Sequence, residues 1–146
     1  MEIMKNLVLV HGFLGGSAQW AAQVNAFSRD FNVVTVDLPG FGLKSGWDAP
    51  KRITDYADFV LDELARLGIK YFHLLGHSMG GMIVQEMTAR APERIESLVL
   101  YGTGPLGIMP GRFESIEESR CRASEDGAES TGKRILPHAI ASGSTE

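Results

Sequence analysis

Four short apolar runs, rich in leucine and β-branched residues, punctuate the first hundred residues of the chain. Their hydrophobic positions are nearly continuous and do not alternate with polar ones, which is typical of strands buried on both faces of a parallel sheet. Each run ends in glycine or proline, the residues that mark turns. The four runs are residues 6–12, 32–40, 71–77 and 97–104.

Helical patterns separate these runs. Residues 17–28 and 53–68 carry apolar side chains at spacings of three and four, which places them on one face of a helix. We expect Thr54 to be the N-cap of the second helix and Gly68 to end it. A third helix is expected over residues 79–91. The β-α-β-α-β-α-β order predicts a parallel sheet with right-handed crossovers and a three-layer α/β/α architecture.

The character of the chain changes after residue 106. The remaining residues are charged and rich in glycine, serine and glutamate, and they contain one expected amphipathic helix, at about residues 113–123. They contain no apolar run as clear as the first four. We therefore expect residues 1–106 to form the α/β core and residues 107–146 to form a separate segment.

Composition and charge exclude several classes of function. The formal net charge is −4 with both signs mixed along the chain, so we expect no nucleic-acid partner. One cysteine, Cys121, forms no internal disulfide, and no Cys/His cluster suggests a metal; we expect no cofactor. The apolar run before His11 is shorter than a signal peptide needs, and no run approaches the ~20 residues of a membrane span. We expect no membrane association and a cytoplasmic location.

A serine stands among glycines directly after the third apolar run. The stretch "GHSMG" fits the G-x-S-x-G pattern of a nucleophile on a sharp strand-to-helix turn. Such a turn leaves Ser78 on a strained backbone, and a Cβ at Gly76 or Gly80 would collide with neighbouring backbone. The turn also places Ser78 at a helix N-terminus, where N–H groups favour developing negative charge. The pattern predicts that Ser78 is a catalytic nucleophile.

A second motif, "HGFLGG", follows the first apolar run. Acyl transfer needs two N–H donors aimed at the oxyanion. We expect these donors to be the backbone N–H groups of Phe13 and of Met79, the residue after the nucleophile. Gly12 has no side chain, which allows the loop that carries "HGFLGG" to approach a substrate closely.

With "DLPGFG" at residues 37–42, these motifs stand in the order found in the α/β-hydrolase superfamily, and residues 5–106 resemble its N-terminal, nucleophile half. The chain is most similar to serine esterases and carbon–carbon bond hydrolases, including the meta-cleavage-product hydrolases. The resemblance implies a partial α/β-hydrolase fold, with residues 107–146 as the start of a lid or an altered tail. Related epoxide hydrolases and haloalkane dehalogenases carry aspartate at the nucleophile position, so Ser78 argues against those two chemistries.

The resemblance also implies a histidine and an acid that follow the serine in the chain. Asp37 precedes Ser78, so we expect a structural role for it. His11 resembles a structural family residue, His73 is expected in the core, and the ring of His77 should diverge from the serine. His138 is the one downstream histidine, but no strand precedes it, and we expect that it is not the base.

We therefore expect a serine hydrolase that acts on a small ester or related carbonyl compound through an acyl-enzyme at Ser78. We expect it to be truncated or altered at its C-terminal end and weakly active or inactive. The alternative is a non-catalytic fragment that binds small ligands or partner chains. A nucleotide-binding domain is disfavoured because "HGFLGG" is not G-x-G-x-x-G. The last strand of such a partial sheet would be an unpaired edge, which predicts self-association.

Overall fold

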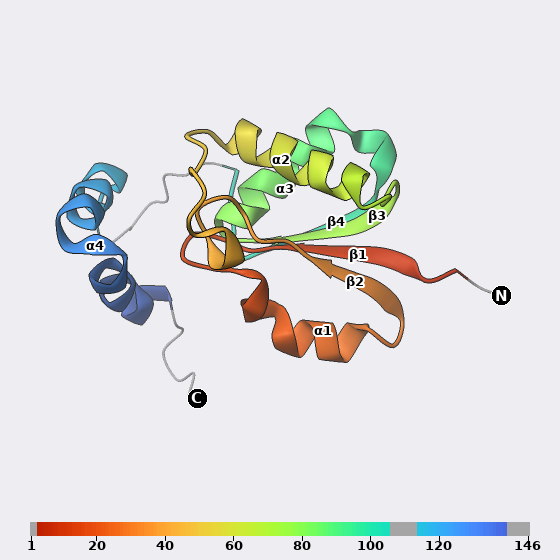
Figure 1. Ribbon diagram of the computed structural model, residues 1–146, viewed down its shortest axis with the longest axis horizontal. Helices are drawn as coiled ribbons and strands as arrows, with labels where there is room; N and C mark the ends of the chain where they lie inside the picture. Colours follow the sequence, from red (N-terminus) through yellow and green to blue (C-terminus); the bar gives the residue numbers. More distant parts are fainter. Residues whose placement is uncertain (1–2, 106–113, 140–146) are drawn as a thin grey trace. The chain divides into compact units, whose positions relative to one another are not determined.

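The computed structural model describes residues 3–105 and 114–139 (Figure 1). The chain forms two compact units, Met1–Gly107 and Ile108–Glu146. The first unit contains a four-stranded sheet, and all of its strand pairs are parallel. The strands lie in the order β2-β1-β3-β4 and comprise β1 (Lys5–Val10), β2 (Phe31–Thr35), β3 (Phe72–His77) and β4 (Ile95–Tyr101). The predicted parallel sheet is confirmed.

Helices cover both faces of this sheet, which confirms the predicted three-layer arrangement. Helices α2 (Ile53–Arg66) and α3 (Met79–Arg90) lie on one face, and α1 (Ala21–Phe27) lies on the other (Figure 1). The prediction of one continuous helix over residues 17–28 was wrong, because Ser17–Trp20 forms a 3₁₀ turn, η1, before α1. The N–H of Ala21 bonds to the carbonyl of Ala18, three residues back, which is the tighter 3₁₀ pattern.

The hydrophobic core fills the space between the sheet and the helices α2 and α3. Alternate residues of β1 and β3 point into it, among them Val8, Val10, Phe72 and Leu74, all fully buried. Burial of these side chains is the main source of the stability of the first unit, at roughly 25 cal/mol for each Å² of apolar surface removed from water. Core residues on the helices are Tyr56, Ala57, Val60, Leu61, Leu64, Ile83, Val84 and Met87.

The two ends of α2 test the predicted caps. Gly68 has φ +76°, and the Ile69 N–H bonds to the Leu64 carbonyl at 2.9 Å, so the predicted glycine stop is confirmed. The predicted N-cap was wrong. Arg52 holds that position in an extended conformation and makes no side-chain cap, while the buried Thr54 hydroxyl has no hydrogen-bond partner.

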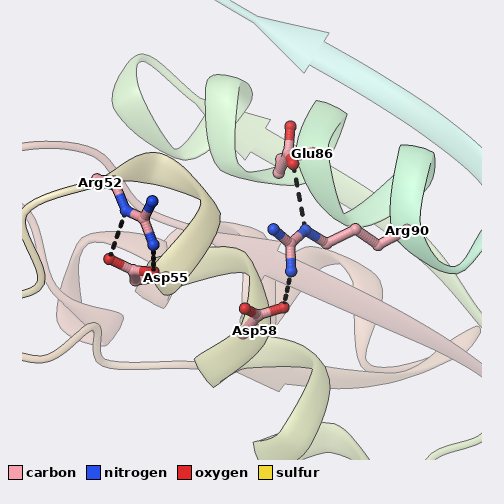
Figure 2. Close-up of polar contacts among 5 residues, drawn as sticks. All are labelled: Arg52, Asp55, Asp58, Glu86 and Arg90. Atoms are coloured by element: carbon pink, nitrogen blue, oxygen red, sulfur yellow. Dashed lines mark hydrogen bonds and ion pairs between the residues drawn. The ribbon is translucent and has the colours of Figure 1, made fainter.

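Charged side chains join α2 to α3 at the surface. Arg90 of α3 donates to Glu86, one turn earlier, at 3.1 Å and also pairs with Asp58 of α2 (Figure 2). Arg52 pairs separately with Asp55 at 3.0 Å. These groups are substantially exposed to solvent, which screens their charges, so each pair contributes little to stability. Only the pair between Arg90 and Asp58 joins the two helices; the other two pairs are local to one helix.

Strand β4 is more exposed than its apolar run predicts. Its apolar run was expected to be buried on both faces, but the exposed fractions are 48% for Val99, 47% for Leu100 and 63% for Tyr101. The reason is strand order: among the described residues, β4 lies at one edge of the sheet and pairs with β3 alone. A hydrophobic pattern reports what a strand can bury and does not report which neighbours it has.

The second unit contains α4 (Ile116–Ala139), which is longer than the helix expected at about residues 113–123. Ser115 and Glu118 form a capping box at its start: the Glu118 N–H bonds to the Ser115 hydroxyl at 3.1 Å, and the Ser115 N–H bonds to the Glu118 carboxylate at 2.8 Å. Gly127, with φ +81° and ψ 173°, interrupts the helical backbone. Residue 113 lies outside the described residues.

Candidate active site

Ser78 lies at the junction between β3 and α3, where the sequence predicts a nucleophile. Its backbone has φ +56° and ψ −122°, a conformation that residues with a side chain rarely adopt, and its side chain is exposed. Hydrogen bonds from both directions hold this strained residue. Its N–H bonds to the Tyr101 carbonyl at 3.2 Å, and its carbonyl accepts from the Thr103 hydroxyl at 2.6 Å and the Gly81 N–H at 2.9 Å.

Two glycines allow helix α3 to start this close to the sheet. A Cβ on Gly76 would lie 2.4 Å from the Gly80 carbonyl oxygen, and a Cβ on Gly80 would lie 2.3 Å from the Val10 carbonyl oxygen. Both distances are far below van der Waals contact with backbone, which cannot give way. These positions therefore require glycine, and the turn brings the N-terminus of α3 against the carboxyl ends of β1 and β3.

The loop after β1 lies directly beside the serine. A Cβ on Gly12 would lie 2.9 Å from both the Ser78 Cβ and the His77 carbonyl oxygen, and 3.2 Å from the Met79 nitrogen. The structure thus brings Gly12 beside Ser78 and Met79, from which it is remote in sequence. Phe13 is the next residue of this loop, and its ring is about half exposed and meets the ring of Phe41 edge-on.

A second contact fixes the far end of the same loop. Asp37, 7% exposed, accepts hydrogen bonds from the Ser17 N–H at 2.9 Å and from the Ser17 hydroxyl at 2.7 Å. Burial raises the pKa of Asp37, but the hydrogen bonds from Ser17 and the Leu43 N–H, with the nearby His11, outweigh it and leave the pKa below its ordinary value. Asp37 is a carboxylate that joins the loops after β1 and β2.

His11 makes the matching connection at the near end of the loop. Its Nε2 accepts from the Leu38 N–H at 3.0 Å, and its Nδ1 lies 2.8 Å from the Gly12 carbonyl oxygen. Because a carbonyl only accepts, Nδ1 carries the proton, and the ring is the neutral Nδ1–H tautomer. Burial lowers the pKa of His11, against the Gly12 carbonyl and Asp37, which raise it. The resemblance pointed to a structural His11, but these partners could not be read from the sequence.

Two other histidines lie in β3. The ring of His77 packs against Tyr101 and Trp20, at centroid distances of 5.3 and 6.4 Å, and burial lowers its pKa. His73 is not a simple core residue: its Nδ1 lies 2.7 Å from the Ser97 hydroxyl and its Nε2 lies 3.4 Å from the Glu96 carboxylate. Neither contact involves the hydroxyl of Ser78.

Two residues that follow Ser78 in the chain and carry base or acid chemistry, His138 and Asp126, lie in the second unit. His138 falls within the range of α4, and the exposed Asp126 precedes the break at Gly127. Within residues 3–105, no hydrogen bond reaches the Ser78 hydroxyl oxygen. The described residues as a whole contain no cluster of His, Cys, Asp or Glu that could hold a metal ion, and none of their helices has the length and hydropathy to span a membrane.

Comparison with known proteins connects this geometry to one family. The model of the alpha/beta hydrolase fold matches residues 5–122. A RutD protein of Rhizobium rhizogenes, named as a carbamate hydrolase, is 39% identical over 98 residues, which cover 66% of this chain and 37% of that protein. The carboxylesterase YbfK of Bacillus subtilis is 36% identical over 96 residues, covering 65% of this chain and 32% of the esterase.

Solved structures agree with the sequence matches. The enol-lactonase of Burkholderia xenovorans superimposes with a TM-score of 0.80 at 27% identity, over 93% of this chain and 51% of the lactonase. A thermophilic esterase of Thermogutta terrifontis gives 0.78 at 25% identity, over 91% of this chain and 49% of the esterase. The chain therefore spans about half the length of these structures and about a third of the curated relatives. Its four parallel strands, their flanking helices and the family match show that the chain belongs to the α/β-hydrolase fold family.

Proposed function

We propose that Ser78 is the nucleophile of an acyl hydrolase that acts on a small ester or a related carbonyl compound. The observation that carries this proposal is the backbone of Ser78, which is held at φ +56° with an exposed side chain between a strand and a helix. Strain of this kind persists only where the surroundings enforce it, and it is a feature of functional sites. The esterase and lactonase among the similar proteins support the same class of reaction.

In the proposed reaction, the Ser78 hydroxyl oxygen attacks the carbonyl carbon and the hydroxyl proton passes to a base. The resulting oxyanion accepts hydrogen bonds from the N–H groups of Phe13 and Met79. The closeness of Gly12 to Ser78 and Met79 supports this pairing, because Phe13 follows Gly12 directly. Collapse expels the alcohol or amine, which takes up the proton, and water then hydrolyses the acyl-enzyme.

The proposed reaction needs a base that accepts the hydroxyl proton of Ser78. Within residues 3–105, no histidine contacts the Ser78 hydroxyl, and a serine without a base is a poor nucleophile. An oxyanion hole alone retains only part of the catalytic effect, on the order of 10³–10⁴-fold over water. We therefore propose weak activity for this chain. The same observation favours a second function, a non-catalytic module that binds small acyl ligands at the elbow.

Reaction with a fluorophosphonate probe distinguishes the two functions. The purified chain is incubated with the probe, and the modified residue is identified by mass spectrometry. We expect labelling of Ser78 that is absent in Ser78→Ala and retained in Ser45→Ala, which removes another exposed serine. A folded chain that is not labelled at Ser78 would exclude the hydrolase and leave the binding function.

A further inference from the structure

The segment that follows β4 holds Ser78 from both sides. The Ser78 N–H bonds to the Tyr101 carbonyl at 3.2 Å, and the Ser78 carbonyl accepts from the Thr103 hydroxyl at 2.6 Å. Gly102 lies between these two residues with φ +55°, a conformation that glycine adopts without a steric cost. This turn lets the carbonyl of Tyr101 and the side chain of Thr103 reach the same residue of the elbow.

Gly81 makes room for the side chain of Thr103. A Cβ on Gly81 would overlap the Cβ, Oγ1 and Cγ2 atoms of Thr103. The threonine side chain therefore lies directly against the backbone of the first turn of α3. Because a β-branched side chain is stiff at χ1, this packing holds the hydroxyl towards the Ser78 carbonyl. The contact also explains the last glycine of "GHSMGG", which the G-x-S-x-G pattern does not require.

Gln85 fixes the residue that follows Thr103. Its side-chain amide donates to the Gly104 carbonyl at 3.3 Å and to the Gly81 carbonyl at 3.1 Å. The loop after β4 is thus tied to α3 by Gln85, next to the position where Thr103 packs on Gly81. Since Thr103 is held on both sides in the chain, its hydroxyl is a fixed donor.

The Thr103 hydroxyl acts on the peptide group that carries one of the proposed oxyanion donors. The Ser78 carbonyl and the Met79 N–H belong to one planar trans peptide, so they point in opposite directions. The carbonyl also accepts from the Gly81 N–H at 2.9 Å and therefore points into α3. The Met79 N–H points out of the helix, where the first residue has no intrahelical acceptor. The loop at Gly12 lies on that side, since a Cβ there would be 3.2 Å from the Met79 nitrogen.

We propose, on the basis of the proposed function of Ser78, that Thr103 is a positioning residue for the oxyanion hole. Its hydroxyl fixes the plane of the Ser78–Met79 peptide and so aims the Met79 N–H at the developing oxyanion. Without the hydroxyl, the Gly81 N–H alone holds the carbonyl, and the peptide is free to tilt. A hydrogen bond weakens steeply as its donor is misaligned. Such a tilt lowers the stabilisation of the transition state without removing the donor.

Two comparisons isolate the hydroxyl of Thr103. Thr103→Val replaces the hydroxyl by a methyl group of similar size, while Thr103→Ser and Thr103→Ala differ from each other only in the hydroxyl. Labelling of Ser78 by the fluorophosphonate is followed in the full chain at several probe concentrations, which separates the maximal rate from the half-saturating concentration. Outright loss of an oxyanion donor costs roughly 10²–10³-fold, so we expect the valine and alanine variants to lower the maximal rate by about tenfold. The half-saturating concentration should not change, and Thr103→Ser should keep most of the rate.

Thr88→Val is the matched control. The Thr88 hydroxyl donates to the Val84 carbonyl at 2.8 Å, so this variant removes the same kind of bond from the body of α3. Its labelling rate should equal that of the unchanged chain. Equal slowing in Thr88→Val and Thr103→Val, or equal rates for Thr103→Ser and Thr103→Ala, would overturn the proposal. If Thr103→Val does not fold, as judged by urea unfolding, the serine and alanine variants carry the same comparison.

A second measurement does not depend on reactivity. Since linked hydrogen bonds polarise one another, loss of the bond at the Ser78 carbonyl should shift the amide nitrogen resonance of Met79. We expect this shift in Thr103→Val and Thr103→Ala but not in Thr88→Val. A Met79 resonance that stays in place in the first two variants would show that Thr103 does not hold the peptide. A folded, unchanged chain that is not labelled would instead contradict the proposed function of Ser78, and the Met79 resonance would still decide the structural role of Thr103.

Discussion

Asp37 accepts two hydrogen bonds from Ser17, one from its N–H at 2.9 Å and one from its hydroxyl at 2.7 Å. This pair closes the far end of the glycine-rich loop, whose near end is held by His11. The loop that passes beside Ser78 is thus tied to the neighbouring loop at both of its ends. The proposed oxyanion donor at Phe13 lies between these two ties.

The coupling between Asp37 and Ser17 can be measured by urea unfolding. We expect Ser17→Ala to lower the free energy of unfolding by about 1 kcal/mol and Asp37→Asn by about 1–3 kcal/mol, since the latter weakens the acceptor of buried donors. Because both variants remove the same contact, their effects should not add in the double variant. Additive effects would show that the pair is not coupled.

The protonation of His11 predicts a pH dependence of stability. The folded state lowers the pKa of His11, so it disfavours the proton that the unfolded state binds near the ordinary pKa of 6.5. Stability is therefore complete above that value and declines as pH falls through it towards the folded-state pKa. Urea unfolding at pH 7.5 and 5.5 should show this loss. Burial also lowers the pKa of His77, and His77→Gln removes that contribution.

The variant His11→Ala isolates the contribution of His11 to this loss of stability. At pH 7.5 it should lower the free energy of unfolding by about 1–3 kcal/mol or more, because the buried Leu38 N–H loses its acceptor. The variant should also show a smaller decline in the free energy of unfolding between pH 7.5 and 5.5. An unchanged pH dependence in this variant would contradict the assignment of the decline to His11.

The close approach at Gly80 predicts a large effect of a single methyl group. Gly80→Ala places a Cβ 2.3 Å from the Val10 carbonyl oxygen, and we expect a loss of about 3 kcal/mol or more in the free energy of unfolding. Gly46→Ala is the matched control, since a Cβ there has no neighbour within 4 Å. It should be neutral or slightly stabilising. Similar losses in both variants would argue against the close packing at the elbow.

Strain at Ser78 predicts that replacing the proposed nucleophile stabilises the protein. Ser78→Gly should raise the free energy of unfolding by about 1 kcal/mol, because glycine adopts φ +56° without a steric cost. Ser78→Ala keeps the Cβ and should give no such gain. Ser45→Gly, at φ −59°, should be slightly destabilising. Thermal unfolding of the three variants checks this order.

The sequence contained enough information for the sheet and the elbow because both depend on local patterns. Continuous apolar runs separated by helical periodicity predict parallel strands with crossovers, and glycines around Ser78 predict a turn that only small residues permit. The N-cap of α2 was missed because the chain enters the helix at Arg52 in an extended conformation without a side-chain cap. Thr54 has the right chemistry but lies inside the helix.

What the sequence could not supply are relationships between segments far apart in the chain. His73 looked like a core residue because the residues around it are apolar, but its polar partners come from β4. The contact between Thr103 and the Ser78 carbonyl likewise depends on strand order. The exposure of Val99 and Tyr101 has the same origin, since the pattern alone does not place β4 at an edge.

The central position of β1 also has a consequence for how the protein folds during synthesis. β1 is made before β2 and β3, pairs with β2 on one side and β3 on the other, and Leu7 lies beside His73. Parallel strands need long crossovers, so this pairing closes a large loop. The fully buried side chains of β1 therefore stay uncovered by their final neighbours until β3 has left the ribosome. The first strand of the chain is among the last to complete its contacts.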